Sequence, residues 1–508
     1  MEVLGVLTGR LLINSLTSIA QVVVVGGTYF VLYRFLLSTI GIESLGVWSV
    51  VLATTSVGKF ANTGLSTGVV KFVSTYLARD DRPRVVEIIQ TGTLALGGFT
   101  GVIALLCYPL ARIVLAWFIP EAHLIDALAL LPWALLSLWL GTMAAVFQAG
   151  IDGFQRIDLR CYILMVSSLV YLGLCFALVP RFGLLGLAYA QLAQVSTLLI
   201  MASVVLRRLL PALPLVPHRF SRPLFRELFG YGLNVQVMAV GSLLLEPAAK
   251  GLISKYGGVD LTGYFEMANR MVIQLRQLIN AAASALIPAV AHLEETERGA
   301  IQLVYKESYG GLFYIIWPAL GLTLVSTPLF SELWIGYYQH SFVLYGILLS
   351  VGLYLGMLSS PAFYANLGAG TLRWNVVATF AMLAVTALPN LVTRGALGGT
   401  GMAVCYALAY VVGGAIILVG YHTQNHLGMW SMLPRDCLPT MVASLLGALA
   451  GLSLYGLGRR ALGLPLLGVA TLVIYFGLVF PPLWVHPLRK RLVGLLQREF
   501  GRKGDGDP

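Results

Sequence analysis

The residues from Glu266 to Asn280 place a cationic, amide-rich face opposite an apolar face. The segment contains no glycine or proline and has apolar segments on both sides, which predicts a membrane-spanning helix. At about 100° per residue, seven polar side chains fall within about 160° of one another: Glu266, Asn269, Arg270, Gln274, Arg276, Gln277 and Asn280. Because an arginine at the bilayer centre costs at least ~2.5–3.5 kcal/mol, we expect this face to line water or bind an anion.

Polar stripes are expected on the first two spans as well. Arg10, Asn14 and Gln21 share one face of the first span, and Lys59 and Asn62 share one face of the second. We expect these stripes and the 266–280 face to line one polar cavity. Its cations would bind a diphosphate, because guanidinium and ammonium groups match phosphate oxygens: Arg10, Lys59, Arg270 and Arg276. Amide side chains on the same faces would add hydrogen bonds to the bound ligand: Asn14, Gln21, Asn62, Asn269, Gln274, Gln277 and Asn280.

Two acids lie within expected spans, Glu246 and Glu266. Glu246 is four residues before Lys250, a spacing at which the two can pair on one helix face. Either acid is a candidate for coupling transport to a cation gradient or to the membrane potential. The competing interpretation is that the polar side chains hold helices together and that Glu266 neutralises Arg270.

Three other groupings have simpler structural explanations. His422 and His426 have the spacing of a metal clamp but lack a third ligand nearby, and Asp80 and Asp81 lie among arginines on a loop. Asp152 and Arg156 have the spacing of an i,i+4 pair closing one face of the molecule. We therefore expect neither a metal site nor a cofactor.

The composition is that of a polytopic membrane protein. The chain has 508 residues, 58% of them hydrophobic and 11% charged, and apolar runs of roughly twenty residues recur throughout, which predicts an all-α fold with about fourteen spans. Most of the 33 Lys and Arg residues fall on one side when loops are assigned alternately. This asymmetry predicts cytoplasmic termini in a cytoplasmic (inner) membrane, and it explains the net charge of +11 without nucleic-acid binding.

Three short motifs recur in order along the chain. Gly41–Gly46 matches Gly258–Gly263, Phe147–Ala149 matches Phe363–Ala365, and Gly183–Ala188 matches Gly398–Ala403, at offsets of about 215 to 217 residues. An even number of spans per copy predicts a parallel repeat of two six-helix lobes. The expected domains are lobes at 1–206 and 228–420, a proline-rich linker at 207–227, two further helices within 421–486, and a basic amphipathic cytoplasmic tail at 487–508.

Four stretches resemble a known family: NTGLSTGVVKFVSTYLARDD, FQAGIDGFQRIDLR, GLLGLAYAQL, and LFGYGLNVQV followed by GGVDLTGYFEMANR. They resemble Wzx-type O-antigen or polysaccharide flippases of the multidrug/oligosaccharidyl-lipid/polysaccharide exporter superfamily. The resemblance implies two lobes in a V. It also implies transfer of an undecaprenyl-diphosphate-linked oligosaccharide from the inner to the outer leaflet, and partnership with a polysaccharide polymerase and chain-length machinery.

Two other classes of protein remain as alternatives. A multidrug antiporter of the same superfamily would bind organic cations, for which an acidic and aromatic cavity is expected rather than a basic one. A polytopic glycosyltransferase or polymerase would use the same lipid donor, but the expected outward loops are short and carry no set of Arg, His or paired acids. A membrane transporter without enzymatic activity is therefore the favoured class.

Overall fold

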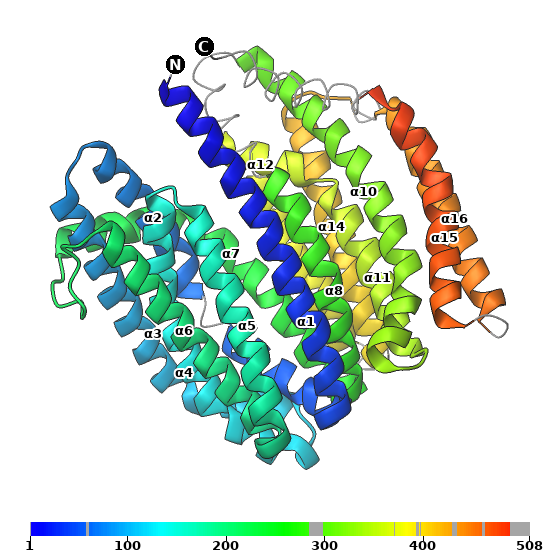
Figure 1. Cartoon of the computed structure of the whole chain (residues 1–508), viewed down its shortest axis with the longest axis horizontal. Helices are drawn as coiled ribbons and strands as arrows, with labels where there is room; N and C mark the ends of the chain where they lie inside the picture. Colours follow the sequence, from blue (N-terminus) through cyan, green and yellow to red (C-terminus); the bar gives the residue numbers. More distant parts are fainter. Residues whose placement is uncertain are drawn as a thin grey trace, which may run out of the picture. The chain divides into compact units, whose positions relative to one another are not determined.

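The structure is a computed structural model, and it describes residues 2–56, 60–283, 298–369, 371–392, 396, 398–428, 434–459 and 463–487. These residues form helices and no β-strand, with one short 3-10 helix, Arg435–Cys437. The α-helices (Figure 1) are α1 Glu2–Ser56, α2 Phe60–Ala78, α3 Arg82–Phe118, α4 Glu121–Gly153, α5 Ile157–Phe182, α6 Leu184–Leu209, α7 Arg222–Gly257, α8 Val259–Ala283, α10 Arg298–Ile335, α11 His340–Met357, α12 Ser360–Gly368, α13 Arg373–Val392, α14 Gly398–Gln424, α15 Leu438–Gly458 and α16 Leu464–Val485.

Many of these helices have the length and surface of membrane spans. Within the described ranges, ten are long and apolar enough to cross a bilayer. Their outward faces are apolar, as Leu105 (78% exposed), Ile125 (80%) and Leu457 (83%) illustrate. A soluble protein avoids such continuous apolar surface, whereas lipid stabilises it. The expected all-α, polytopic membrane fold is therefore confirmed.

The chain divides into two compact units. The first comprises Met1–Met267 and Leu383–Cys405, and the second comprises Ala268–Met382 and Tyr406–Pro508. In the first unit α4 packs against α6 and α3, α5 against α1 and α6, and α7 against α2. In the second unit α15 and α16 pack against each other and against α10. The domain boundaries expected from the repeat stay a prediction.

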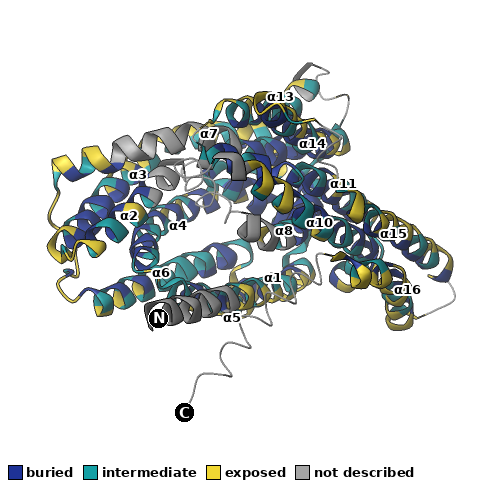
Figure 2. Ribbon diagram, turned by 90° about the horizontal axis from the view of Figure 1, so that it is seen from above, coloured by how far each residue is buried: buried dark blue, intermediate teal, exposed yellow. Residues whose placement is uncertain are grey.

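A buried apolar cluster holds the first unit together. Its members come from α2 to α7 and from the segment between α6 and α7, and side chains such as Val69, Ile89, Val146 and Leu206 are inaccessible to solvent. Figure 2 colours the buried residues along these helices dark blue. The proline-rich segment is non-helical between Leu209 and Arg222, and its backbone is tied to α3. Backbone N–H groups of His218 and Arg219 donate to Gln90 Oε1 at 3.1 Å, and Ser221 N–H donates to Thr91 Oγ1 at 3.1 Å.

Two glycines related by the sequence repeat have the same unusual backbone conformation. Gly41 has φ 79° and ψ 172° at a kink inside α1, and Gly258 has φ 93° and ψ 166° between α7 and α8. This region of φ/ψ space is open essentially to glycine alone. The agreement supports the repeat, because both glycines turn the chain at the start of the same motif.

The same motifs also pack against each other reciprocally inside the first unit. A methyl group added to Gly46 would lie 1.7 Å from the carbonyl oxygen of Val259, and one added to Gly263 would lie 2.6 Å from that of Ile42. Gly46 and Gly263 are repeat equivalents, as are Ile42 and Val259. Reciprocal contact between equivalent residues is the signature of a local two-fold axis.

Gly46→Ala is expected to destabilise the protein by about 1–3 kcal/mol, because the methyl group must push two backbones apart. The matched control is Gly26→Ala on the same helix, where nothing lies within 4 Å of the added methyl group. There alanine should stabilise by about 0.5–1 kcal/mol, because it restricts the unfolded chain. Thermal unfolding in detergent measures both variants, and an unchanged or raised unfolding temperature of Gly46→Ala would contradict the close packing.

Candidate functional site

The first unit contains a buried cluster of three charged side chains from α7 and α8. Lys250 Nζ lies 2.5 Å from Glu246 Oε1 and 2.5 Å from Glu266 Oε2. The Lys250 and Glu266 side chains are 4% and 5% exposed, whereas Glu246 is 36% exposed. The expected i,i+4 pairing of Glu246 with Lys250 is thus confirmed, and Glu266 is a second partner that the sequence did not suggest.

Two hydroxyl groups on α1 also contact Glu266. Tyr33 donates to Glu266 Oε1 at 2.9 Å, and Ser49 donates to Glu266 Oε2 at 3.0 Å. The residues Ser49 and Glu266 are 217 positions apart, which is the offset of the repeat. The carboxylate therefore sits on the local two-fold contact between the repeated motifs, with both oxygens engaged.

The charge of this cluster has a chemical consequence. Buried ions are tolerated only when they are paired and hydrogen-bonded. Two carboxylates share one ammonium group here, so these three side chains together carry one net negative charge when all are ionised. Glu246 is the more exposed acid and is the better placed of the two to exchange a proton.

In the second unit, α8 presents Arg276 to a group of tyrosines. The guanidinium carbon lies 5.0 Å from the centre of the Tyr410 ring, and the Tyr410 hydroxyl is 3.3 Å from that of Tyr406. In the described part of the chain, the electrostatic neighbours of Arg276 are Tyr364, Tyr406 and Tyr410 rather than a carboxylate. Its Nε has no hydrogen-bond partner among these residues. A half-buried guanidinium held by aromatic rings retains its capacity for an anion.

The other predicted binding residues are only partly accounted for. Asn269 is fully buried, Gln21, Arg270 and Gln274 are half-buried, and Gln277 is exposed. Lys59 lies outside the described residues, as do the side chains of Arg10, Asn14, Asn62 and Asn280. One cavity shared by all these side chains stays a prediction.

The predicted pairing of Asp152 with Arg156 is wrong. Asp152 instead lies 2.8 Å from Arg160, and Arg156 donates two hydrogen bonds to Asp158 at 3.0 and 2.9 Å. The i,i+4 rule fails because α4 ends at Gly153, and Gln155 in the turn has φ 58°. Hydrogen bonding to Asp158 raises the pKa of Arg156, because it stabilises the charged guanidinium.

The expected structural explanations of the remaining polar groups agree with their contacts. His422 Nε2 lies 2.8 Å from the Tyr305 hydroxyl in the second unit. Asp81 accepts a hydrogen bond from the Arg84 backbone N–H at the start of α3, as a helix cap does. No group of three His, Cys, Asp or Glu side chains that could hold a metal occurs among the residues described.

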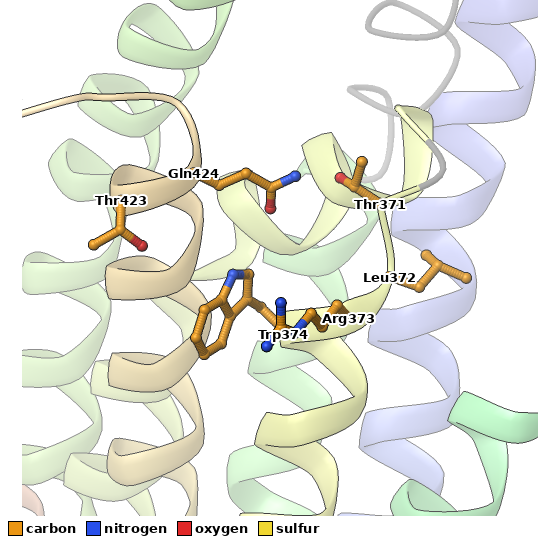
Figure 3. A pocket seen from close by; sticks show the side chains of 6 residues that line it. All are labelled: Thr371, Leu372, Arg373, Trp374, Thr423 and Gln424. Atoms are coloured by element: carbon orange, nitrogen blue, oxygen red, sulfur yellow. The ribbon is translucent and has the colours of Figure 1, made fainter.

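A pocket of about 520 Å³ opens in the second unit beside the start of α13 and the end of α14. Figure 3 shows the Gln424 side chain pointing towards Thr371, with Trp374 and Arg373 below it and Leu372 pointing away. Arg373 lies 5.6 Å from the Trp374 ring centre and is the one cation in the pocket lining. Arg373 therefore serves below as a control position, because its substitution removes a cation from a different pocket.

The fold matches that of known membrane transporters. A lipid II flippase MurJ in an inward closed conformation aligns with a TM-score of 0.68 at 11% identity, covering 93% of this chain and 99% of that one. An inward-facing multidrug resistance MATE family transporter of the MOP superfamily aligns at 0.64 with 16% identity, covering 78% and 94%. A MOP superfamily transporter from Pyrococcus furiosus, described with a binding pocket of reversed polarity, aligns at 0.58 with 14% identity, covering 82% and 95%. The chain therefore has the fold of MOP superfamily transporters.

The family is defined by sequence. A family model described as polysaccharide biosynthesis protein matches residues 31–341, which is most of the chain. The chain belongs to this polysaccharide biosynthesis protein family. No curated protein matches the sequence significantly. The resemblance seen in the sequence is thus confirmed for family and superfamily fold.

Proposed function

We propose that this protein is a flippase that moves a polyprenyl-diphosphate-linked oligosaccharide from the inner to the outer leaflet of the cytoplasmic membrane. Membership of a polysaccharide biosynthesis family supports a glycan substrate, and the MOP fold supports transport rather than glycosyl transfer. The product would enter synthesis of a cell-surface polysaccharide of the O-antigen or capsule type. An undecaprenyl carrier, cytoplasmic termini and a polysaccharide polymerase as partner belong to the same proposal.

The environment of Arg276 carries this proposal. Its guanidinium is half-buried on a helix of a membrane protein and lies against tyrosines. A diphosphate offers oxygens in the planar geometry that a guanidinium recognises, and a low dielectric strengthens the interaction. Tyrosine rings and amides such as Gln274 would bind the attached sugars. Alternating access would then carry the headgroup across while the polyprenyl tail stays in lipid.

A multidrug antiporter is the second candidate, and the buried carboxylates Glu246 and Glu266 are the observation in its favour. Antiporters use such acids for organic cations or protons. Here Lys250 already compensates them, and Glu266 is 5% exposed, so a bulky cation has little access to that carboxylate. We therefore assign the cluster to proton or cation coupling rather than to substrate binding.

Reconstitution tests the proposed function directly. Proteoliposomes loaded with a labelled undecaprenyl-diphosphate oligosaccharide would be assayed for the label that becomes accessible to an external glycosidase. We expect transfer that depends on the protein and increases with a proton gradient or a membrane potential. Drug efflux without glycolipid transfer would instead identify an antiporter, and release of free sugar from the labelled donor would identify a transferase.

A further inference from the structure

A second basic pocket lies inside the first unit, away from the charged cluster. Its volume is about 480 Å³, which is the size of a small-molecule site. Four of its polar lining side chains are Lys71 on α2, Gln148 and Asp152 on α4, and Arg160 on α5, and Ser66 adds a hydroxyl. The proposed function does not use any of these residues.

The pocket gathers parts of the chain that are distant in sequence. Ser66 and Lys71 belong to the stretch NTGLSTGVVKFVSTYLARDD, and the residues from Gln148 to Arg160 belong to FQAGIDGFQRIDLR. The pocket lies next to the turn between α4 and α5, two helices that qualify as membrane spans. It is thus placed at the membrane edge of the first unit, where lipid headgroups are found.

Charge and geometry indicate an anionic ligand. Asp152 Oδ1 lies 2.8 Å from Arg160 Nε, and this ion pair places the guanidinium in the lining of the pocket. Lys71 is exposed and supplies a second positive charge to the same pocket. Two cations against one carboxylate give the lining a net positive charge, and Gln148 and Ser66 add an amide and a hydroxyl to it.

We propose that this pocket binds the phosphate headgroup of a lipid, namely the diphosphate of the lipid-linked oligosaccharide before it is translocated. This assignment rests on the proposed function and adds a loading site at the inner leaflet. Arg160 would bind one phosphate through its terminal amino groups, and Lys71 would act as a point charge on the other. A structural ion pair between α4 and α5 would need Asp152 and Arg160 but not Lys71.

Lys71→Ala tests the pocket, because it removes one cation and leaves the Asp152–Arg160 pair intact. The probe is inorganic pyrophosphate, titrated calorimetrically into the full-length protein in phosphatidylcholine nanodiscs, and all variants are compared in an Arg276→Ala background so that the diphosphate site proposed on α8 does not contribute. We expect the dissociation constant for pyrophosphate to rise about tenfold, because the variant loses one charge-assisted hydrogen bond. Arg373→Ala, which removes a cation from the other pocket, should bind like the wild type. Unchanged binding by Lys71→Ala, or equal losses in both variants, would overturn the proposal.

Two further arms separate the possible sources of the phosphate. Undecaprenyl diphosphate should displace pyrophosphate in nanodiscs that contain phosphatidylglycerol. If phosphatidylglycerol alone abolishes the Lys71-dependent binding, the site belongs to a structural phospholipid and the loading role is wrong. Failure of the flippase proposal can be told apart from failure of the pocket proposal. In the first case the protein would translocate no oligosaccharide but would still bind pyrophosphate in a manner that depends on Lys71.

Discussion

Lys250→Ala should lower the free energy of unfolding by about 3–5 kcal/mol, the cost of leaving buried charge without its partner. Lys250 is 4% exposed and is the counter-ion of both Glu246 and Glu266. Its removal takes the ammonium group away from both carboxylates, whereas the Tyr33 and Ser49 hydroxyls still donate to Glu266. Denaturant titration of the purified protein in detergent measures the loss.

Two further variants distinguish the loss of the buried ion pair from the general effect of truncating a lysine side chain. Lys250→Met combined with Glu266→Gln removes both deeply buried charges at similar volume and should recover most of the stability. Lys306→Ala removes an exposed lysine from α10 and should change the stability by less than about 0.5 kcal/mol. If Lys250→Ala unfolded like Lys306→Ala, Glu266 would have to be uncharged in the folded protein, and the ion-pair description would fail.

We propose that the cluster of Glu246, Lys250 and Glu266 couples transport to a proton or cation gradient. Protonation of one carboxylate would leave a neutral ion pair that still keeps Lys250 satisfied. Such a site can exist in two protonation states and keep the buried ammonium group paired in both, as a coupling site requires. Tyr33 and Ser49 on α1 would report the change, because both donate to Glu266.

Local rules predicted one half of this cluster and missed the other. Glu246 and Lys250 lie on one helix, so their spacing alone predicted the pair. Glu266 reaches Lys250 from a different helix, and no i,i+4 rule describes such a contact. The repeat offset that relates Gly41 to Gly258 also relates Ser49 to Glu266, so the sequence held a signal for the Ser49–Glu266 contact but none for the Lys250–Glu266 pair.

The ends of helices set a second limit. Asp152 and Arg156 have helical spacing, but the helix stops between them, and boundaries are the least certain part of any reading from sequence. The membrane class, by contrast, follows from composition alone, because apolar runs of roughly twenty residues have the length of a helix that crosses a bilayer with its backbone hydrogen bonds satisfied. For the polar stripe on 266–280, the sequence predicted the helix but not the exposure of each polar side chain. Its residues vary from the buried Asn269 to the exposed Gln277, because packing rather than periodicity decides which polar side chains meet solvent.

Arg276→Ala is expected to reduce oligosaccharide translocation about 100-fold, the effect of removing one partner from a desolvated charge pair. The same substitution should lower the stability by only about 0.5–1 kcal/mol, because Arg276 contacts the Tyr410 ring and its electrostatic neighbours in the described part of the chain are tyrosines. This combination is opposite to that of Lys250→Ala, whose main effect is on folding. Translocation in proteoliposomes and unfolding in detergent, measured on the same preparation, separate the two roles.

The matched control is Arg373→Ala, which removes another arginine of the second unit that lies over an aromatic ring. It should translocate like the wild type, because its pocket has no part in the proposed mechanism. Arg276→Lys keeps the charge but loses the planar fork, so an intermediate rate is expected if a phosphate is bound bidentately. Full translocation by a stable Arg276→Ala protein would show that the guanidinium serves only to pack against Tyr410, and the diphosphate would then have to bind elsewhere. If Arg276→Lys translocated at the wild-type rate, the positive charge of Arg276 would suffice for binding, and its planar guanidinium geometry would not be needed.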